Sequence, residues 1–179
     1  MKSKLSFLLL GCLMLGTQAF AAESVSSQVT ASIKSIQNLV FPGIDIGEID
    51  PNATGLSDGF YVKNGSTVTA QSNGGNGYTV VVTQDGRTAG ALFQLDETSG
   101  GTDTMELYLY KGTSMDPGVN ENPPPADGQL VVGSEVFNFS EQTLNEQLAD
   151  LQVALPGAQF TTISEGSYMG TITMTLTDN

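Results

Sequence analysis

The chain has 179 residues with 6 basic and 19 acidic side chains, a formal charge of −13, no histidine and a single cysteine. That length suits one domain, and 39% hydrophobic residues are enough for a core, which argues against a wholly disordered chain. The absence of histidine excludes most catalytic triads and zinc sites, and the negative charge argues against nucleic-acid binding, which depends on Lys and Arg.

The first 21 residues have the pattern of a secretory signal peptide. Two lysines at the start precede an apolar run over 5–15, and Ala19 and Ala21 are the small residues of a cleavage site. We therefore expect export to the periplasm or the cell surface. The apolar run is shorter than the roughly 20 residues that cross a bilayer, and no later segment is a candidate, so no membrane span is expected.

Two modes of cleavage remain open because of Cys12. Cleavage after Ala21 leaves a mature chain without cysteine, in which four basic residues face all 19 acids, for a net charge of −15. The residues before Cys12 also loosely resemble a lipoprotein cleavage site, which would leave a lipid anchor on that cysteine. The apolar run continues beyond Cys12, and this favours ordinary cleavage.

Residues 22–33 form an extension in which apolar and polar side chains alternate. Val25, Ser27, Val29, Ala31 and Ile33 share one face of an extended segment. Taken by itself, this pattern favours an ordinary first strand of a closed sandwich.

Residues 34–179 are expected to form one domain of short strands. The segments with β-prone or alternating composition are 39–41, 67–71, 78–83, 92–95, 105–110, 130–139 and 168–176. A Gly- and Asn-rich turn over 73–77 and a Pro-rich loop over 116–128 separate some of them. Short strands at this spacing predict an all-β, antiparallel β-sandwich.

One segment departs from the strand pattern. Leu144, Leu148 and Leu151 are spaced as on one face of a helix, and Thr143 and Glu146 fit a capping box. The spacing predicts one short helix within 141–151.

Three segments, in this order, carry a resemblance to a known family. The first is Leu39-Val40-Phe41 behind the alternating extension, and the second runs from Gly77 through the strand 78–82 to 105–110. The third is the Thr-rich segment 166–177. Together they resemble the subunits of chaperone–usher pili and the related spore coat protein U-like secreted domains.

The resemblance implies an immunoglobulin-like sandwich that lacks its last strand and leaves an apolar groove. In such subunits the N-terminal extension of a neighbouring subunit fills the groove by strand addition. The donor residues would be Val25, Ser27, Val29, Ala31 and Ile33, of the extension described above. The groove would be formed by a C-terminal strand that carries Tyr168, Ile172, Met174 and Leu176.

The function implied by the resemblance is that of a structural subunit of a surface fibre that supports adhesion, not an enzyme and without a cofactor. Its partners would be further subunits, a periplasmic chaperone and an outer-membrane usher. Many relatives carry a disulfide early in the domain, which this chain cannot form after cleavage at Ala21.

The same residues are compatible with other functions. The main alternative is a monomeric secreted β-sandwich that binds a ligand such as a carbohydrate, with its own N-terminal strand closing the sheet. Asp45, Glu48 and Asp50 crowd one segment, but no EF-hand spacing is present, so no metal site is expected. A glycosidase is disfavoured because the chain has no tryptophan platform for sugars.

Overall fold

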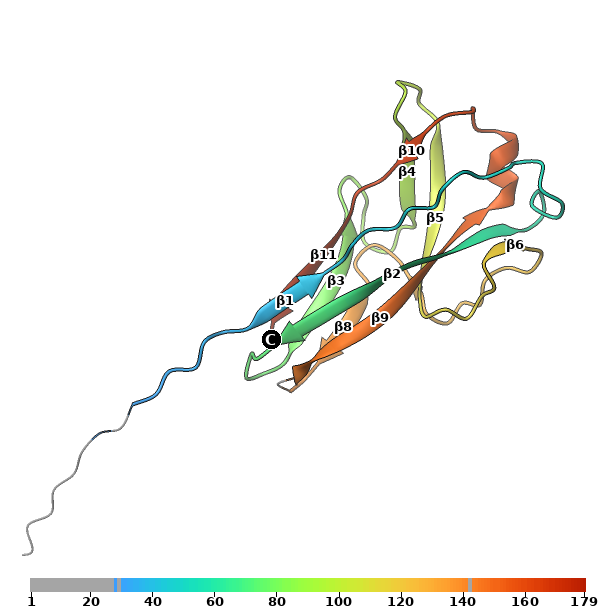
Figure 1. The fold of residues 1–179 in the computed structure, drawn as a ribbon. Coiled ribbons are helices and arrows are strands. Elements are labelled where there is room, and N and C mark those ends of the chain that lie inside the picture. Colours follow the sequence, from blue (N-terminus) through green and yellow to red (C-terminus); the bar gives the residue numbers. More distant parts are fainter. Residues whose placement is uncertain (1–27, 29, 142) are drawn as a thin grey trace, which may run out of the picture. The chain divides into compact units, whose positions relative to one another are not determined.

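The computed structural model describes residues 28, 30–141 and 143–179 (Figure 1). It separates into the units Met1–Ile33 and Lys34–Asn179. In the first unit, Gln28 and residues 30–33 are exposed and belong to no strand. The expected signal peptide and three of the expected donor residues, Val25, Ser27 and Val29, lie outside the described residues.

The unit Lys34–Asn179 consists of two antiparallel sheets. The larger has the order β1-β2-β9-β5-β4-β10, with β6 beside β2 and β7 beside β5; the smaller has the order β11-β3-β8. The strands are β1 (Gln37–Val40), β2 (Phe60–Ser72), β3 (Tyr78–Gln84), β4 (Phe93–Glu97), β5 (Thr104–Lys111), β6 (Gly118–Asn120), β7 (Gln129–Leu130), β8 (Glu135–Phe139), β9 (Thr143–Pro156), β10 (Tyr168–Met169) and β11 (Ile172–Asp178).

The core lies between the sheets and follows the alternation of the strands. In β3, Tyr78, Val80 and Val82 are fully buried, while the residues between them are partly exposed. They belong to one apolar cluster with buried residues of β2, β5 and β9 from the opposite sheet. This arrangement confirms the predicted all-β, antiparallel β-sandwich.

The predicted helix within 141–151 is wrong, because β9 is a strand that begins at Thr143. Leu144 and Leu148 are 59% and 65% exposed, so the leucine spacing does not mark a buried face. The buried residues of β9 instead include Ala149, Leu151 and Val153, which alternate as in a strand. Pairing with β2 and β5 satisfies the backbone hydrogen-bonding groups of this segment, and this outweighs its helical sequence pattern.

Helical structure is confined, in the described part of the chain, to the short 3₁₀ helix η1 (Gly157–Thr161). No helix among these residues is long and apolar enough to cross a membrane.

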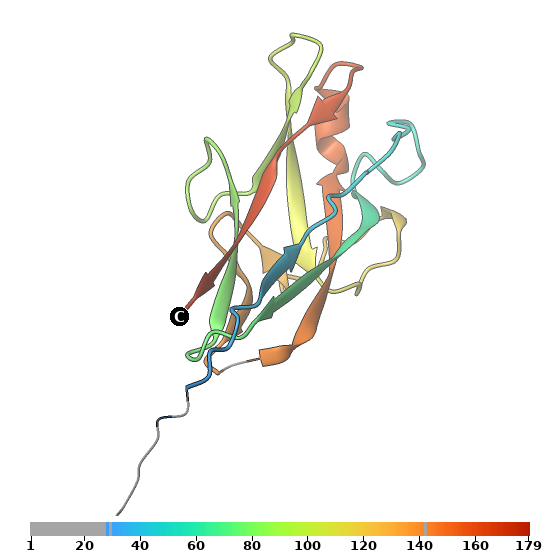
Figure 2. The same ribbon diagram turned by 60° about the vertical axis from the view of Figure 1, so that its left-hand side comes forward.

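The chain passes from one sheet to the other at Gly170, between β10 and β11 (Figure 2). β10 pairs with β4 of the larger sheet, whereas β11 pairs with β3 of the smaller sheet. Next to this crossing, the side chain of Gln84 forms two hydrogen bonds with the backbone of Gln94 in β4. Gln84 Nε2 donates to Gln94 O at 2.6 Å, and Gln94 N donates to Gln84 Oε1 at 2.8 Å. A Cβ on Gly170 would run into Gln94 O, so the close passage requires glycine.

Candidate functional site

Two strand edges border one side of the sandwich. β1 is the last strand at one end of the larger sheet, and β11 is the last strand at one end of the smaller sheet. Figures 1 and 2 both show β1 and the segment after it facing β11 and β10. Among the described residues, each of these two strands is therefore paired on one flank only.

The open edge of β11 carries backbone groups at Ile172, Met174 and Leu176. In the adjacent β3, Val82 N donates to Ser134 O and Val82 O accepts from Gly133 N, so the backbone of Val82 faces away from β11. Its partner in the register is Met174. Because hydrogen-bonded and non-hydrogen-bonded pairs alternate in an antiparallel ladder, the N–H and C=O groups of these three residues point away from β3.

The open edge of β1 lies at Gln37 and Leu39. Asn73 N donates to Ile36 O at 3.1 Å, and Val40 is in register with Thr69 of β2. The alternation then directs the backbone groups of Gln37 and Leu39 away from β2. Both edges thus present donors and acceptors to the space between them, which is the arrangement that accepts an added strand.

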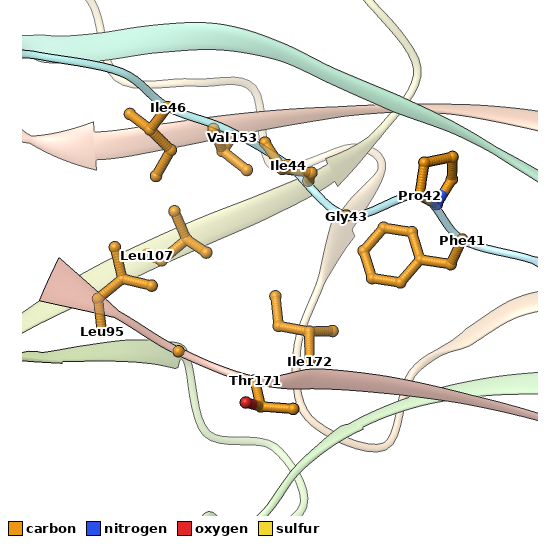
Figure 3. A pocket seen from close by; sticks show the side chains of 11 residues that line it. Phe41, Pro42, Gly43, Ile44, Ile46, Leu95, Leu107, Val153, Thr171 and Ile172 are labelled. Atoms are coloured by element: carbon orange, nitrogen blue, oxygen red, sulfur yellow. The ribbon is translucent and has the colours of Figure 1, made fainter.

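An apolar groove lies between the segment that follows β1 and the turn that leads into β11, as Figure 3 shows. Phe41, Ile44 and Ile46 from the segment after β1 form one wall, and Ile172 with the preceding turn forms the other. Its floor consists of core side chains at Leu95, Leu107 and Val153. The hollow is about 300 Å³ in volume.

Gly65 in β2 allows the first wall to lie close to the sheet. A Cβ at this position would meet Ile44 Cδ1 and Leu151 O at 2.9 Å each. The glycine therefore lets Ile44 rest on the backbone of β2, where Ile44 packs against the main core cluster.

The groove widens toward β10 into a second hollow of about 670 Å³. Ile46 and Leu95 line both hollows, so the two are neighbours. The lining of the wide end combines apolar side chains with acidic ones: Ile46, Ile49, Leu95, Met105, Leu155, Phe160, Ile163 and Tyr168, together with Asp45, Glu48 and Glu165.

The opposite end of the groove is closed by polar contacts. Gln37 Nε2 donates to Asp178 Oδ2 at 2.6 Å and so joins the start of β1 to the end of β11. Ser72 Oγ, at the end of β2, donates to the other carboxylate oxygen of Asp178. The groove is consequently tied together at this end and open at the other.

The electrostatic environment of the wide end is negative. Hydrogen bonds from Ser164 lower the pKa of Asp103, including one from its backbone N–H at 2.7 Å. Loss of hydration, together with the nearby charges of Asp103 and Glu97, raises the pKa of Tyr168. The Tyr168 shift indicates that Asp103 and Glu97, which are not among the lining residues, also act on this end of the groove.

The expected groove residues are divided between β11 and β10. Ile172, Met174 and Leu176 alternate on β11, are partly buried and pack on the main cluster. Tyr168 belongs to β10, not to the same strand, and lines the wide end. Of the expected donor residues, the described ones are Ala31 and Ile33; both are exposed, Ile33 by 90%.

Sequence reasoning missed the wall after β1 and the floor of the groove. Ile44 and Ile46 alternate within a Gly- and Asp-rich segment, and this was the signal that could have identified the wall. The floor residues Leu95, Leu107 and Val153 belong to three separate strands, and only the pairing of β4, β5 and β9 brings them together.

Among the described residues, no group of three or more Cys, Asp or Glu side chains is placed to hold a metal ion. No protein-family model matches this chain, and no curated protein matches it at a significant level.

Proposed function

We propose that the chain is a structural subunit of a bacterial surface fibre, and that the N-terminal extension of a second copy completes its sandwich by strand addition. The observation that carries this proposal is an apolar groove between the segment after β1 and residues 170–172, in line with the open backbone edges of β1 and β11. A strand inserted there would pair with both sheets and cover core side chains.

The extension has the composition that such a groove requires. Val25, Val29 and Ile33 fall on one face of the extended segment, and Ile172, Met174 and Leu176 likewise share one face of β11, where Ile172 lines the groove. Fully burying one Val or Ile side chain contributes about 1.5–3 kcal/mol. A rigid groove also reduces the ordering cost of binding, because only the incoming segment must lose conformational freedom.

The proposal also explains why the chain would need help before assembly. An open apolar edge promotes association with any available strand, and proteins that carry one normally cover it. A periplasmic chaperone that lends a strand, and an outer-membrane usher that exchanges it, would meet this need along the export route indicated by the expected signal peptide. Adhesion would follow from display of the fibre at the surface.

Deletion of residues 22–33 tests the proposal. The shortened chain, co-expressed with its chaperone, is expected to remain a folded, chaperone-bound subunit that forms no fibre, while the full mature chain polymerises. Size-exclusion chromatography with light scattering and electron microscopy measure the outcome. Fibre growth by the shortened chain would overturn strand addition by the extension. A mature chain that stays monomeric at all concentrations would overturn the proposal and favour the monomeric ligand-binding alternative.

A further inference from the structure

The two ends of the groove differ in charge. The wide end carries Asp45, Glu48 and Glu165, all three exposed. At the closed end, the carboxylate of Asp178 already accepts hydrogen bonds from Ser72 and Gln37. An incoming cation would therefore be attracted most strongly to the wide end.

The extension is followed directly by such a cation, Lys34, which is exposed. Two of the other three basic residues after Ala21 are engaged within the sandwich. Arg87 donates to Leu92 O and Gln94 Oε1, and Lys111 Nζ donates to Val136 O at 2.6 Å.

The position of Lys34 depends on which molecule supplies the strand. Only residues 34–36 separate Ile33 from β1, so an extension that folds back into its own groove must run antiparallel to β1. That hairpin leaves Ile33 and Lys34 at the closed end and Val25 at the wide end. An extension from a second copy can run parallel to β1, which brings Ile33 and Lys34 to the wide end.

We propose that the acidic wide end of the groove receives Ile33 and Lys34 of a second copy of this chain, and that this match favours insertion between molecules over closure by the chain's own extension. The inference rests on the proposed function. Ile33 would cover the apolar residues Ile163 and Phe160, while the Lys34 ammonium would lie among the three carboxylates. An extension inserted in this direction runs antiparallel to β11.

The lengths agree with this placement. The ten residues 24–33 span about 33 Å as a strand at roughly 3.3 Å per residue. The opposite wall from Tyr168 to Asp178 has a similar number of residues and is extended over most of its length. A segment that runs along this wall from Asp178 therefore ends with Ile33 close to Tyr168, and its first residues must displace Gln37 from Asp178, the contact that closes the other end of the groove.

Cysteine trapping in the mature chain tests the inference, since Cys12 is the only natural cysteine and lies before the expected cleavage site. Lys34→Cys combined with Glu165→Cys is expected to give a disulfide-linked ladder on non-reducing gels. Val25→Cys combined with Glu165→Cys is expected to give none. Lys34→Cys combined with Asp127→Cys, on an exposed loop, is the matched control and should stay unlinked.

Charge exchange provides a second readout that does not depend on a disulfide. Lys34→Glu is expected to slow polymerisation about tenfold at low salt, and adding Glu48→Lys and Glu165→Lys in the same chain should restore the rate. Lys63→Glu changes the net charge equally and should have little effect. The difference should shrink at high salt, where exposed charges are screened.

The outcomes separate this inference from the proposed function. If the wild-type chain polymerises but Lys34→Glu polymerises at the same rate and no ladder forms, the inference is wrong while strand addition stands. A disulfide within single chains carrying Val25→Cys and Glu165→Cys would show self-closure and overturn the inference. Fibre growth without residues 22–33 would instead overturn the proposed function.

Discussion

Gln37 and Asp178 are joined by a hydrogen bond of 2.6 Å, although 141 positions separate them in the sequence. The bond links the first strand of one sheet to the last strand of the other, at the end where the groove is closed. Since Asp178 also accepts from Ser72, whose side chain is fully buried, one carboxylate connects β1, β2 and β11. This connection makes Asp178 the natural place to test how the two sheet edges are held.

Replacing Asp178 by Ala is expected to lower the free energy of unfolding by about 1–2 kcal/mol. The change removes two hydrogen bonds to a charged acceptor and leaves the Ser72 hydroxyl with less compensation. Denaturant unfolding measures the loss. Asp127→Ala, at an exposed loop position, is the control and should change stability by less than about 0.5 kcal/mol. Equal effects of the two substitutions would contradict the role of Asp178.

Ile172→Asp is expected to abolish capture of a donor strand, because it places a charge in the apolar groove. Thr173→Asp is the matched control, since Thr173 is exposed on the opposite face of the same strand. Secretion and polymer yield are measured for both, together with the melting temperature of each chaperone-bound subunit. Normal polymer from Ile172→Asp would argue against a groove-facing role of this residue.

Gly170→Ala is expected to destabilise the domain by about 1–3 kcal/mol. Its Cβ would overlap Gln94 O and come within 3.0 Å of Leu95 Cδ2, so the crossing between β10 and β11 must shift. Gly75→Ala is the comparison, because a Cβ there meets nothing within 4 Å. Thermal unfolding of both variants measures the difference, and similar stabilities would show that the crossing tolerates a side chain.

Alkaline titration should reveal Tyr110 as a late-ionising tyrosine. Burial, and to a lesser extent the nearby Tyr108, raises the pKa of Tyr110 to about 12 from an ordinary value of 10. The unfolded chain then loses this proton at lower pH than the folded chain does. The resulting stability is fully present below about pH 10 and is lost as the pH rises toward 12.

The measurement compares wild type with Tyr110→Phe. Absorbance titration follows tyrosinate formation, and denaturant unfolding between pH 9 and 12 follows stability. The variant should lose less stability over this interval than wild type. Identical slopes for the two proteins would contradict the shifted pKa.

Strands with strict alternation could be predicted from the sequence. β3 pairs with another strand on each flank. Its apolar residues Tyr78, Val80 and Val82 are also buried, so the alternation of the sequence matches the alternation of burial. β9 shows where such reasoning fails. Its leucine spacing fits a helix, and its strand alternation begins only at Ala149, so local pattern could not decide between the two.

The groove could be predicted only in part. The alternation of Ile172, Met174 and Leu176 identifies an apolar face of β11, because it is a local property. Which residues lie opposite depends on the register of several strands and on the crossing at Gly170. The contact of Gln37 with Asp178 and the acidic wide end arise from tertiary packing, which single-sequence periodicity does not encode.

The brevity of the connection between extension and domain has a mechanical consequence for the proposed fibre. Lys34 would lie at the wide end of the groove of one subunit, and β1 of its own subunit begins at Gln37. Only Ser35 and Ile36 therefore connect the two subunits. Three peptide steps reach at most about 11 Å, which leaves little room for swinging or twisting at each joint. Fibres built this way should be stiff, and lengthening the joint with a few glycines should make them visibly more curved in micrographs.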